Sequence, residues 1–100
     1  SEITRFSVLS EKKLKAKLSV GSMYNCPAIA LCAPELTLTL PPHITAATGM
    51  DALTHAMESY VNKATQPISE GLSLQSMKMI ARSLRLAVVQ GENLSERSDM

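Results

Sequence analysis

The feature that most constrains this sequence is a change in its hydrophobic period at Pro41 and Pro42. Before the two prolines, apolar residues recur mainly at every second position, as on strands, whereas beyond them they recur every three or four positions, as on helices. Proline lacks a backbone N–H and restricts the residue before it, so two prolines in a row end the preceding element. The sequence therefore predicts an α+β chain that is sheet-rich up to about Leu40 and helical beyond it.

The sheet-rich part predicts a hairpin and one further strand. Over residues 5–20, apolar and polar residues alternate on both sides of the polar stretch SEKK, which is typical of a short β-hairpin. The run PAIALCA, residues 27–33, is almost continuously apolar and lies between Pro27 and Pro34. This run predicts a short strand buried on both faces, in which Cys32 would act as a small buried hydrophobic residue.

The helical part predicts two long helices and the start of a third. The first should run from about His43 to Asn62 and the second from about Pro67 to Val89, with Gly91 after its end and the start of a third helix in NLSERSDM. Each helix should pack through an apolar stripe, and the stripes are Met50, Leu53, Met57, Tyr60 and Val61, then Leu74, Met77, Ala81, Leu84 and Val88. Because alanines fill much of its remaining surface, the first helix is expected to be mostly buried.

The composition argues against several classes of function. A net charge of +1 with scattered Lys and Arg argues against nucleic-acid binding. No apolar run approaches the roughly 20 residues of a membrane span, and the first residues do not resemble a secretion signal, so we expect a cytoplasmic protein with no membrane partner. Cys26 and Cys32 are too far apart for a redox pair or a zinc half-site and should be free thiols. The four glycines are too widely spaced for a phosphate-binding loop.

The stretch GMDALTHAME, residues 49–58, places Asp51 and His55 four residues apart. On a helix the two side chains project side by side, and a carboxylate oxygen with an imidazole nitrogen suits Fe(II) or Zn(II) when further ligands complete the site. An unpaired carboxylate on a buried helix would also require compensation, which a cation could supply. The alternative is a simple ion pair worth a few tenths of a kcal/mol. His43 lies too far along a continuous helix to be a third ligand and should be exposed.

The segment PELTLTLPPHITAATGMDALTHAMESYV, residues 34–61, resembles the signature of the iron-dependent, or iron-activated, alcohol dehydrogenases. SEITRFSVLS resembles the end of that family's GTGSEVT segment and the hairpin after it, while QPISEGLSLQSMKMIARSL and GENLSERSDM resemble the helices that follow the signature. The resemblance implies an internal segment of a longer enzyme. Residues 1–40 would end a Rossmann-like dinucleotide-binding domain, and residues 41–100 would begin an all-helical, metal-binding domain.

The resemblance also implies site residues. Asp51 and His55 match the first two metal ligands of the family, whose two further histidines lie downstream and have no counterpart here. The NAD(P) contacts implied by the resemblance are Thr4 and Lys17 near the dinucleotide, and Leu36 and Leu40 on the adenosine side. The alternatives are a strand hydroxyl for Thr4, a solvated charge for Lys17 and core packing for the two leucines.

The implied reaction is reversible hydride transfer between the nicotinamide and a small alcohol or carbonyl compound, with the metal as a Lewis acid. The isolated 100 residues are expected to be inactive, since they carry two metal ligands and no pyrophosphate loop. Their apolar helices should favour self-association into a homo-oligomer. The competing hypothesis is a non-catalytic helical association module, in which Asp51 and His55 form a structural ion pair.

Overall fold

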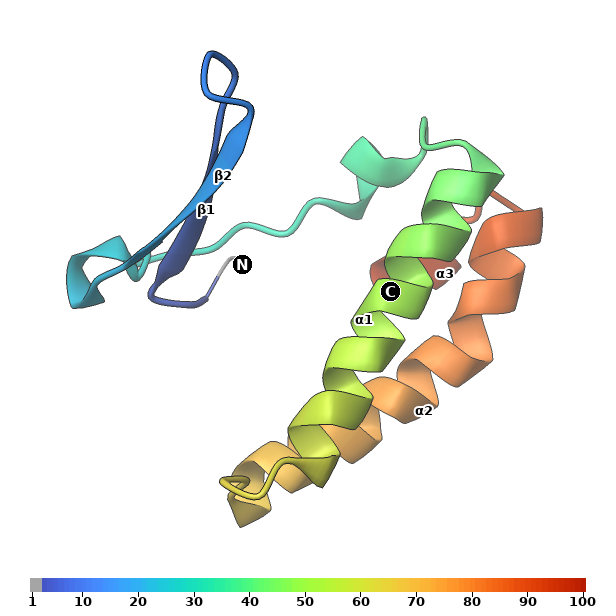
Figure 1. Ribbon diagram of the computed structural model, residues 1–100. Helices are drawn as coiled ribbons and strands as arrows, with labels where there is room; N and C mark the ends of the chain where they lie inside the picture. Colours follow the sequence, from blue (N-terminus) through green and yellow to red (C-terminus); the bar gives the residue numbers. More distant parts are fainter. Residues whose placement is uncertain (1–2) are drawn as a thin grey trace. The chain divides into compact units, whose positions relative to one another are not determined.

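The computed structural model describes residues 3–100 and divides the chain into two compact units, Ser1–Cys32 and Ala33–Met100. The first unit contains strands β1 (Phe6–Glu11) and β2 (Ala16–Gly21) and the short 3₁₀ helix η1 (Met23–Asn25). The second contains the 3₁₀ helix η2 (Pro34–Thr37) and the α-helices α1 (Pro42–Val61), α2 (Pro67–Val89) and α3 (Leu94–Ser98) (Figure 1). The predicted order of a hairpin followed by two long helices and a short third one is confirmed.

The two strands form an antiparallel hairpin, as the alternating pattern predicts. Phe6 pairs with Gly21 at the open end, and Glu11 pairs with Ala16 beside the turn. The Glu11 carboxylate accepts a hydrogen bond of 2.9 Å from the backbone N–H of Lys13, and Lys15 adopts a left-handed conformation with φ of 47°. The polar turn therefore carries the one backbone conformation that is uncommon for a residue other than glycine among the described residues.

The strand predicted at residues 27–33 is wrong. This segment has no regular secondary structure, and the side chains of Ile29 and Leu31 are 80% and 91% exposed. Cys32 is also exposed, contrary to prediction, although it and Cys26 are free thiols as predicted. A strand requires a hydrogen-bonded neighbour, and the two strands of the described sheet pair with each other. An apolar run indicates that a segment suits burial, but it does not supply the strand beside it.

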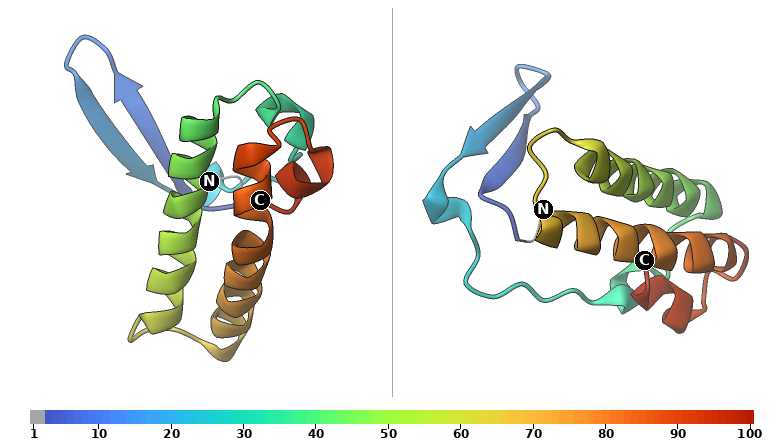
Figure 2. Two further views of the ribbon diagram at one scale, coloured as in Figure 1. Left: turned by 90° about the vertical axis from the view of Figure 1, so that its right-hand side faces the viewer. Right: turned by 90° about the horizontal axis from the view of Figure 1, so that it is seen from below.

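The long helices α1 and α2 lie side by side and run in opposite directions (Figures 1 and 2). Both begin at a proline, Pro42 and Pro67, where the missing N–H costs no intrahelical hydrogen bond. The short helix α3 contacts α2 and η2, and the Asn93 side chain caps it by accepting from the backbone N–H of Glu96. The predicted bounds of α1 and α2 agree with the structure to within one residue. No helix within residues 3–100 combines the length and apolar character that crossing a membrane requires.

The fully buried positions of the two helices are mostly small side chains, and the predicted apolar stripes are only partly buried. The buried residues are Thr45, Gly49 and Ala56 of α1, and Ser73, Ile80, Ser83 and Ala87 of α2. In the predicted stripes, Met50 and Met57 are exposed, as are Leu74 and Ala81, so the expectation of a mostly buried first helix is wrong for this chain. Small residues let two helix backbones come close, and the larger apolar side chains beside them are then left on the flanks.

Gly49 of α1 lies against the side chain of Leu84 on α2. A Cβ atom at this position would lie 2.2 Å from Cδ1 of Leu84 and 3.0 Å from Cε of Met100. At Gly71 on α2, by contrast, a Cβ atom would meet nothing within 4 Å. The two helical glycines therefore differ in what they contribute to packing.

We predict that Gly49→Ala lowers the free energy of unfolding by about 1–3 kcal/mol, because Leu84 must move or the helices must separate. The matched control, Gly71→Ala, should raise it by about 0.5–1 kcal/mol by reducing the entropy of the unfolded chain. Urea unfolding followed by far-UV circular dichroism measures both. The double change Gly49→Ala with Leu84→Ala should cost less than the sum of the single changes. Equal stability of the two glycine variants would contradict the close approach.

Candidate functional site

Asp51 and His55 lie on an exposed side of α1. Each side chain is 72% exposed, and Nε2 of His55 is 4.0 Å from Oδ1 of Asp51. The spacing of four residues brings the two groups together as the sequence predicts, but the distance is too long for a hydrogen bond. Oδ1 of Asp51 and Nε2 of His55 therefore lie close together without a hydrogen bond between them.

The chemistry of this pair fits part of a divalent metal site. With bonds of about 2.1 Å, the two ligand atoms of a tetrahedral ion lie about 3.4 Å apart. The observed 4.0 Å is slightly longer, and a small side-chain rotation at exposed residues is enough to close the difference. Within residues 3–100, no group of three or more His, Cys, Asp or Glu side chains could hold a metal ion. The pair can therefore supply two ligands, and any others have to come from elsewhere.

The Asp51 carboxylate is accessible to water, so the prediction that its burial requires a cation is wrong. What favours a metal here is the adjacency of the two donors and not a desolvation penalty. Glu58, one turn beyond His55, is exposed as well. His43 is exposed at the start of α1, as predicted.

The predicted cofactor residues fall in both units. Thr4 precedes β1 and donates from Oγ1 to the carbonyl of Phe6 at 3.2 Å, while Lys17 is exposed on β2. In the second unit, Leu36 of η2 is largely exposed and Leu40 is half-buried. Core packing therefore does not account for Leu36. Both leucines lie in the short segment before α1.

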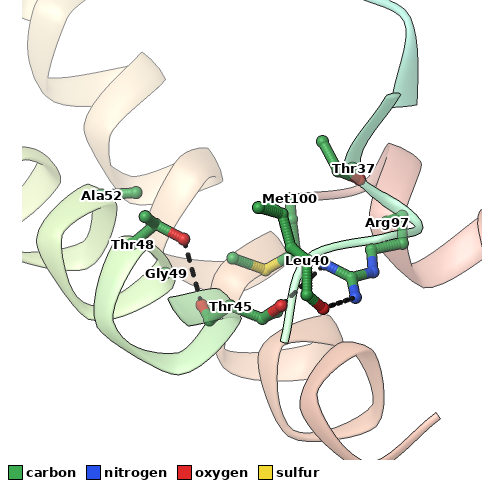
Figure 3. A pocket seen from close by; sticks show the side chains of 8 residues that line it. All are labelled: Thr37, Leu40, Thr45, Thr48, Gly49, Ala52, Arg97 and Met100. Atoms are coloured by element: carbon green, nitrogen blue, oxygen red, sulfur yellow. Dashed lines mark hydrogen bonds between the residues drawn. The ribbon is translucent and has the colours of Figure 1, made fainter. Parts of the chain in front are cut away.

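A cavity of about 180 Å³ lies beside that segment, between η2, the first half of α1 and the end of the chain (Figure 3). The residues that line it are Thr37, Leu40, Thr45, Thr48, Gly49, Ala52, Arg97 and Met100. Of these, sequence reasoning selected only Leu40. Thr45, Thr48 and Gly49 belong to the segment ITAATGM, whose small residues indicate close packing but give no sign of a cavity.

Arg97 is the functional candidate that sequence reasoning missed. The residue is only 6% exposed, and its guanidinium donates from Nε to the carbonyl of Gly91 at 2.9 Å. Nη1 donates to Oγ1 of Thr45 at 2.8 Å, and Nη2 donates to the carbonyl of Leu40 at 3.4 Å (Figure 3). All three acceptors are neutral. In the polar stretch NLSERSDM an arginine is expected to be solvated, so the sequence carries no signal of this burial.

Comparison with known proteins identifies the family of this chain. The model of the Fe-containing alcohol dehydrogenase family, C-terminal, matches residues 45–100, which include Asp51, His55 and Arg97. This chain belongs to the Fe-containing alcohol dehydrogenase family. The resemblance drawn from the sequence is therefore confirmed.

Individual relatives match the whole chain or nearly all of it. It is 45% identical over 100 residues to the 1,3-propanediol dehydrogenase of Citrobacter freundii and 44% identical to long-chain-alcohol dehydrogenase 1 of Geobacillus thermodenitrificans, covering 26% and 25% of those proteins. The crystal structure of sulfoacetaldehyde reductase from Bifidobacterium kashiwanohense in complex with NAD⁺ matches 98% of this chain and 26% of that one, with a TM-score of 0.90 and 38% identity. The chain thus spans about a quarter of the length of these relatives.

We predict that Asp51→Ala and His55→Ala each change the free energy of unfolding by less than about 0.5 kcal/mol in metal-free protein. An exposed pair one helical turn apart contributes little, and alanine favours the helix. Thermal unfolding compares both variants with Thr54→Ala, an exposed position on the same helix. A loss of more than about 1 kcal/mol confined to the Asp51 and His55 variants would show that the pair supports the fold by itself.

Proposed function

We propose that this chain is an internal segment of a metal-dependent NAD(P) alcohol dehydrogenase or aldehyde reductase. The reaction is reversible hydride transfer between the nicotinamide and a small alcohol or carbonyl compound. The observation that carries the proposal is the Asp51–His55 pair on α1, which lies inside the residues matched by the family model. Relatives that are dehydrogenases and a reductase, one of them in complex with NAD⁺, support the same reaction class.

The chain would lie across a domain junction. We assign residues 1–40 to the end of a Rossmann-like dinucleotide-binding domain and residues 41–100 to the start of an all-helical domain. Two observations support this division: regular α-helix begins at Pro42, and the family model for the C-terminal part begins at residue 45.

Asp51 and His55 would hold Fe(II) or Zn(II) together with ligands from the rest of the full-length protein. When bound, such an ion polarises the carbonyl oxygen of the substrate as a Lewis acid. The contribution of this chain is to position the donors: α1 is fixed by its contact with α2, and its two ligand side chains lie outside that contact. The pair is therefore presented on a rigid element with its donor atoms accessible.

Thr4, Lys17, Leu36 and Leu40 are the proposed contacts to the dinucleotide. Lys17 offers an exposed positive charge, and Thr4 offers a hydroxyl group at the start of the hairpin. Leu36 is an exposed apolar side chain and Leu40 borders a cavity, which suits the faces of an adenosine. Each of these residues has a surface available for such a contact.

A second candidate function is a helical association module. Exposed apolar side chains on both long helices favour it, and they include Met50, Met57, Val61, Ile68 and Leu72. Such surfaces also support the proposal that the enzyme is a homo-oligomer.

The two free thiols suit a cytoplasmic location.

In the full-length protein, Asp51→Ala or His55→Ala should abolish turnover and lower the bound metal to well below one ion per chain, because a remaining single donor chelates far more weakly. Elemental analysis measures the metal, and circular dichroism checks that α1 is retained. Thr54→Ala, on the same helix, should keep both metal and turnover. Full metal occupancy in the Asp51 and His55 variants would refute the metal assignment and favour the association module.

Lys17→Ala should raise the apparent KM for the dinucleotide more than the KM for the alcohol, because the lost charge would face the cofactor. Steady-state kinetics with each substrate varied in turn measures both constants. Lys12→Ala removes an exposed lysine from the hairpin turn and should leave both unchanged. An unaltered KM for the dinucleotide in Lys17→Ala would show that this lysine is only a solvated surface charge.

A further inference from the structure

The Arg97 side chain contacts three segments of the helical unit. Its guanidinium reaches the carbonyl of Leu40, which ends the segment before α1, the hydroxyl of Thr45 in the first turn of α1, and the carbonyl of Gly91 between α2 and α3. Leu40 and Arg97 are 57 residues apart in the sequence. The residues before α1, the start of α1 and the turn after α2 are therefore held around one side chain.

Burial of this cation against neutral acceptors is costly unless its geometry is well satisfied. The planar guanidinium directs its N–H groups along fixed directions, so it can hold several acceptors at constant relative positions, which a lysine ammonium cannot do. At Gly91, a Cβ atom would lie 3.3 Å from Nη2, so the turn also fits closely around the side chain. The site thus suits arginine through the directions of its N–H groups and through its close fit.

The helix α3 has an anchor that does not depend on Arg97. The carboxylate of Asp99 pairs with Arg82 and accepts a hydrogen bond from Oγ of Ser83 at 3.3 Å, and both partners belong to α2. Asn93 caps the start of α3. What the Arg97 side chain adds is a set of hydrogen bonds from this end of the helical unit to Leu40 and Thr45.

We propose that Arg97 is a positioning residue that fixes the Leu36–Leu40 segment relative to α1. Under the proposed function, on which this inference rests, that segment contacts the dinucleotide while α1 carries the metal ligands Asp51 and His55. Arg97 touches neither group and acts through Leu40 and Thr45. It would keep the Leu36–Leu40 segment at a constant position relative to Asp51 and His55, as a reaction that needs both a cofactor and a metal ion requires.

The expected signature is a loss of dinucleotide affinity with the metal retained. Without the guanidinium, the segment before α1 loses the hydrogen bond at Leu40 that holds it near the helix, and it populates other conformations. If the competent conformation falls to about a tenth of the population, the apparent Kd for the dinucleotide rises about tenfold. Asp51 and His55 stay on α1, so metal content should remain that of the unaltered protein.

The experiment uses the full-length protein. NADH is titrated by its fluorescence, metal is measured by elemental analysis, and thermal unfolding is followed on the same samples. Arg97→Met and Thr45→Val remove the two sides of one hydrogen bond, whereas Thr45→Ser retains the hydroxyl group. Arg82→Met removes the ion pair to Asp99 without touching Leu40 or Thr45 and is the control for general loosening of α3.

We expect Arg97→Met and Thr45→Val to weaken NADH binding about tenfold with metal content unchanged. Arg97→Lys should recover part of the lost affinity. Thr45→Ser and Arg82→Met should bind NADH as the unaltered protein does. Lower thermal stability with an unchanged Kd would overturn the proposal and leave Arg97 a purely structural residue. If Arg97→Met does not fold, the Kd of Thr45→Val for NADH compared with that of Thr45→Ser tests the proposal by itself. Failure of the unaltered protein to bind NADH would instead refute the proposed function itself.

Discussion

The close contact between α1 and α2 is the constraint on which the rest of the helical unit depends. Gly49 leaves no room for a Cβ atom beside Leu84, and the other buried positions of the contact are mostly small residues. Close contact fixes the rotation of α1 about its axis, because only its small-residue face can approach α2 so nearly. This rotation decides which side chains of α1 remain outside, and Asp51 and His55 are among them.

The candidate site combines the exposed side chains of Asp51 and His55 with the buried side chain of Arg97. Asp51 and His55 need no desolvation to lie side by side, so they cost the fold little and leave their donor atoms open. Arg97 is the opposite case, a buried cation that is tolerated because three acceptors surround it. The division is physically reasonable, since a ligand has to be reached from outside whereas a support works best where water cannot compete for its hydrogen bonds.

Two expectations failed for the same physical reason. The apolar run at residues 27–33 and the apolar stripe of Met50 and Met57 both indicate surfaces suited to burial, yet both are exposed. A hydrophobic pattern indicates that burying a surface is favourable in free energy, but it does not indicate which segment buries it. The chain spans about a quarter of its relatives, so the proposed full-length enzyme would contain further segments able to do so.

The sequence by itself determined the local features: the hairpin, the two long helices to within one residue at each end, and the adjacency of Asp51 and His55. Each of these follows from a period of two or of 3.6 residues and from proline chemistry, which act over a few neighbouring residues. Only the tertiary structure decided which face of α1 is packed, that Asp51 is solvated, and that Arg97 is buried against Leu40 and Thr45. Those outcomes depend on how closely surfaces distant in the sequence approach one another, a property of shape that a hydrophobic pattern does not encode.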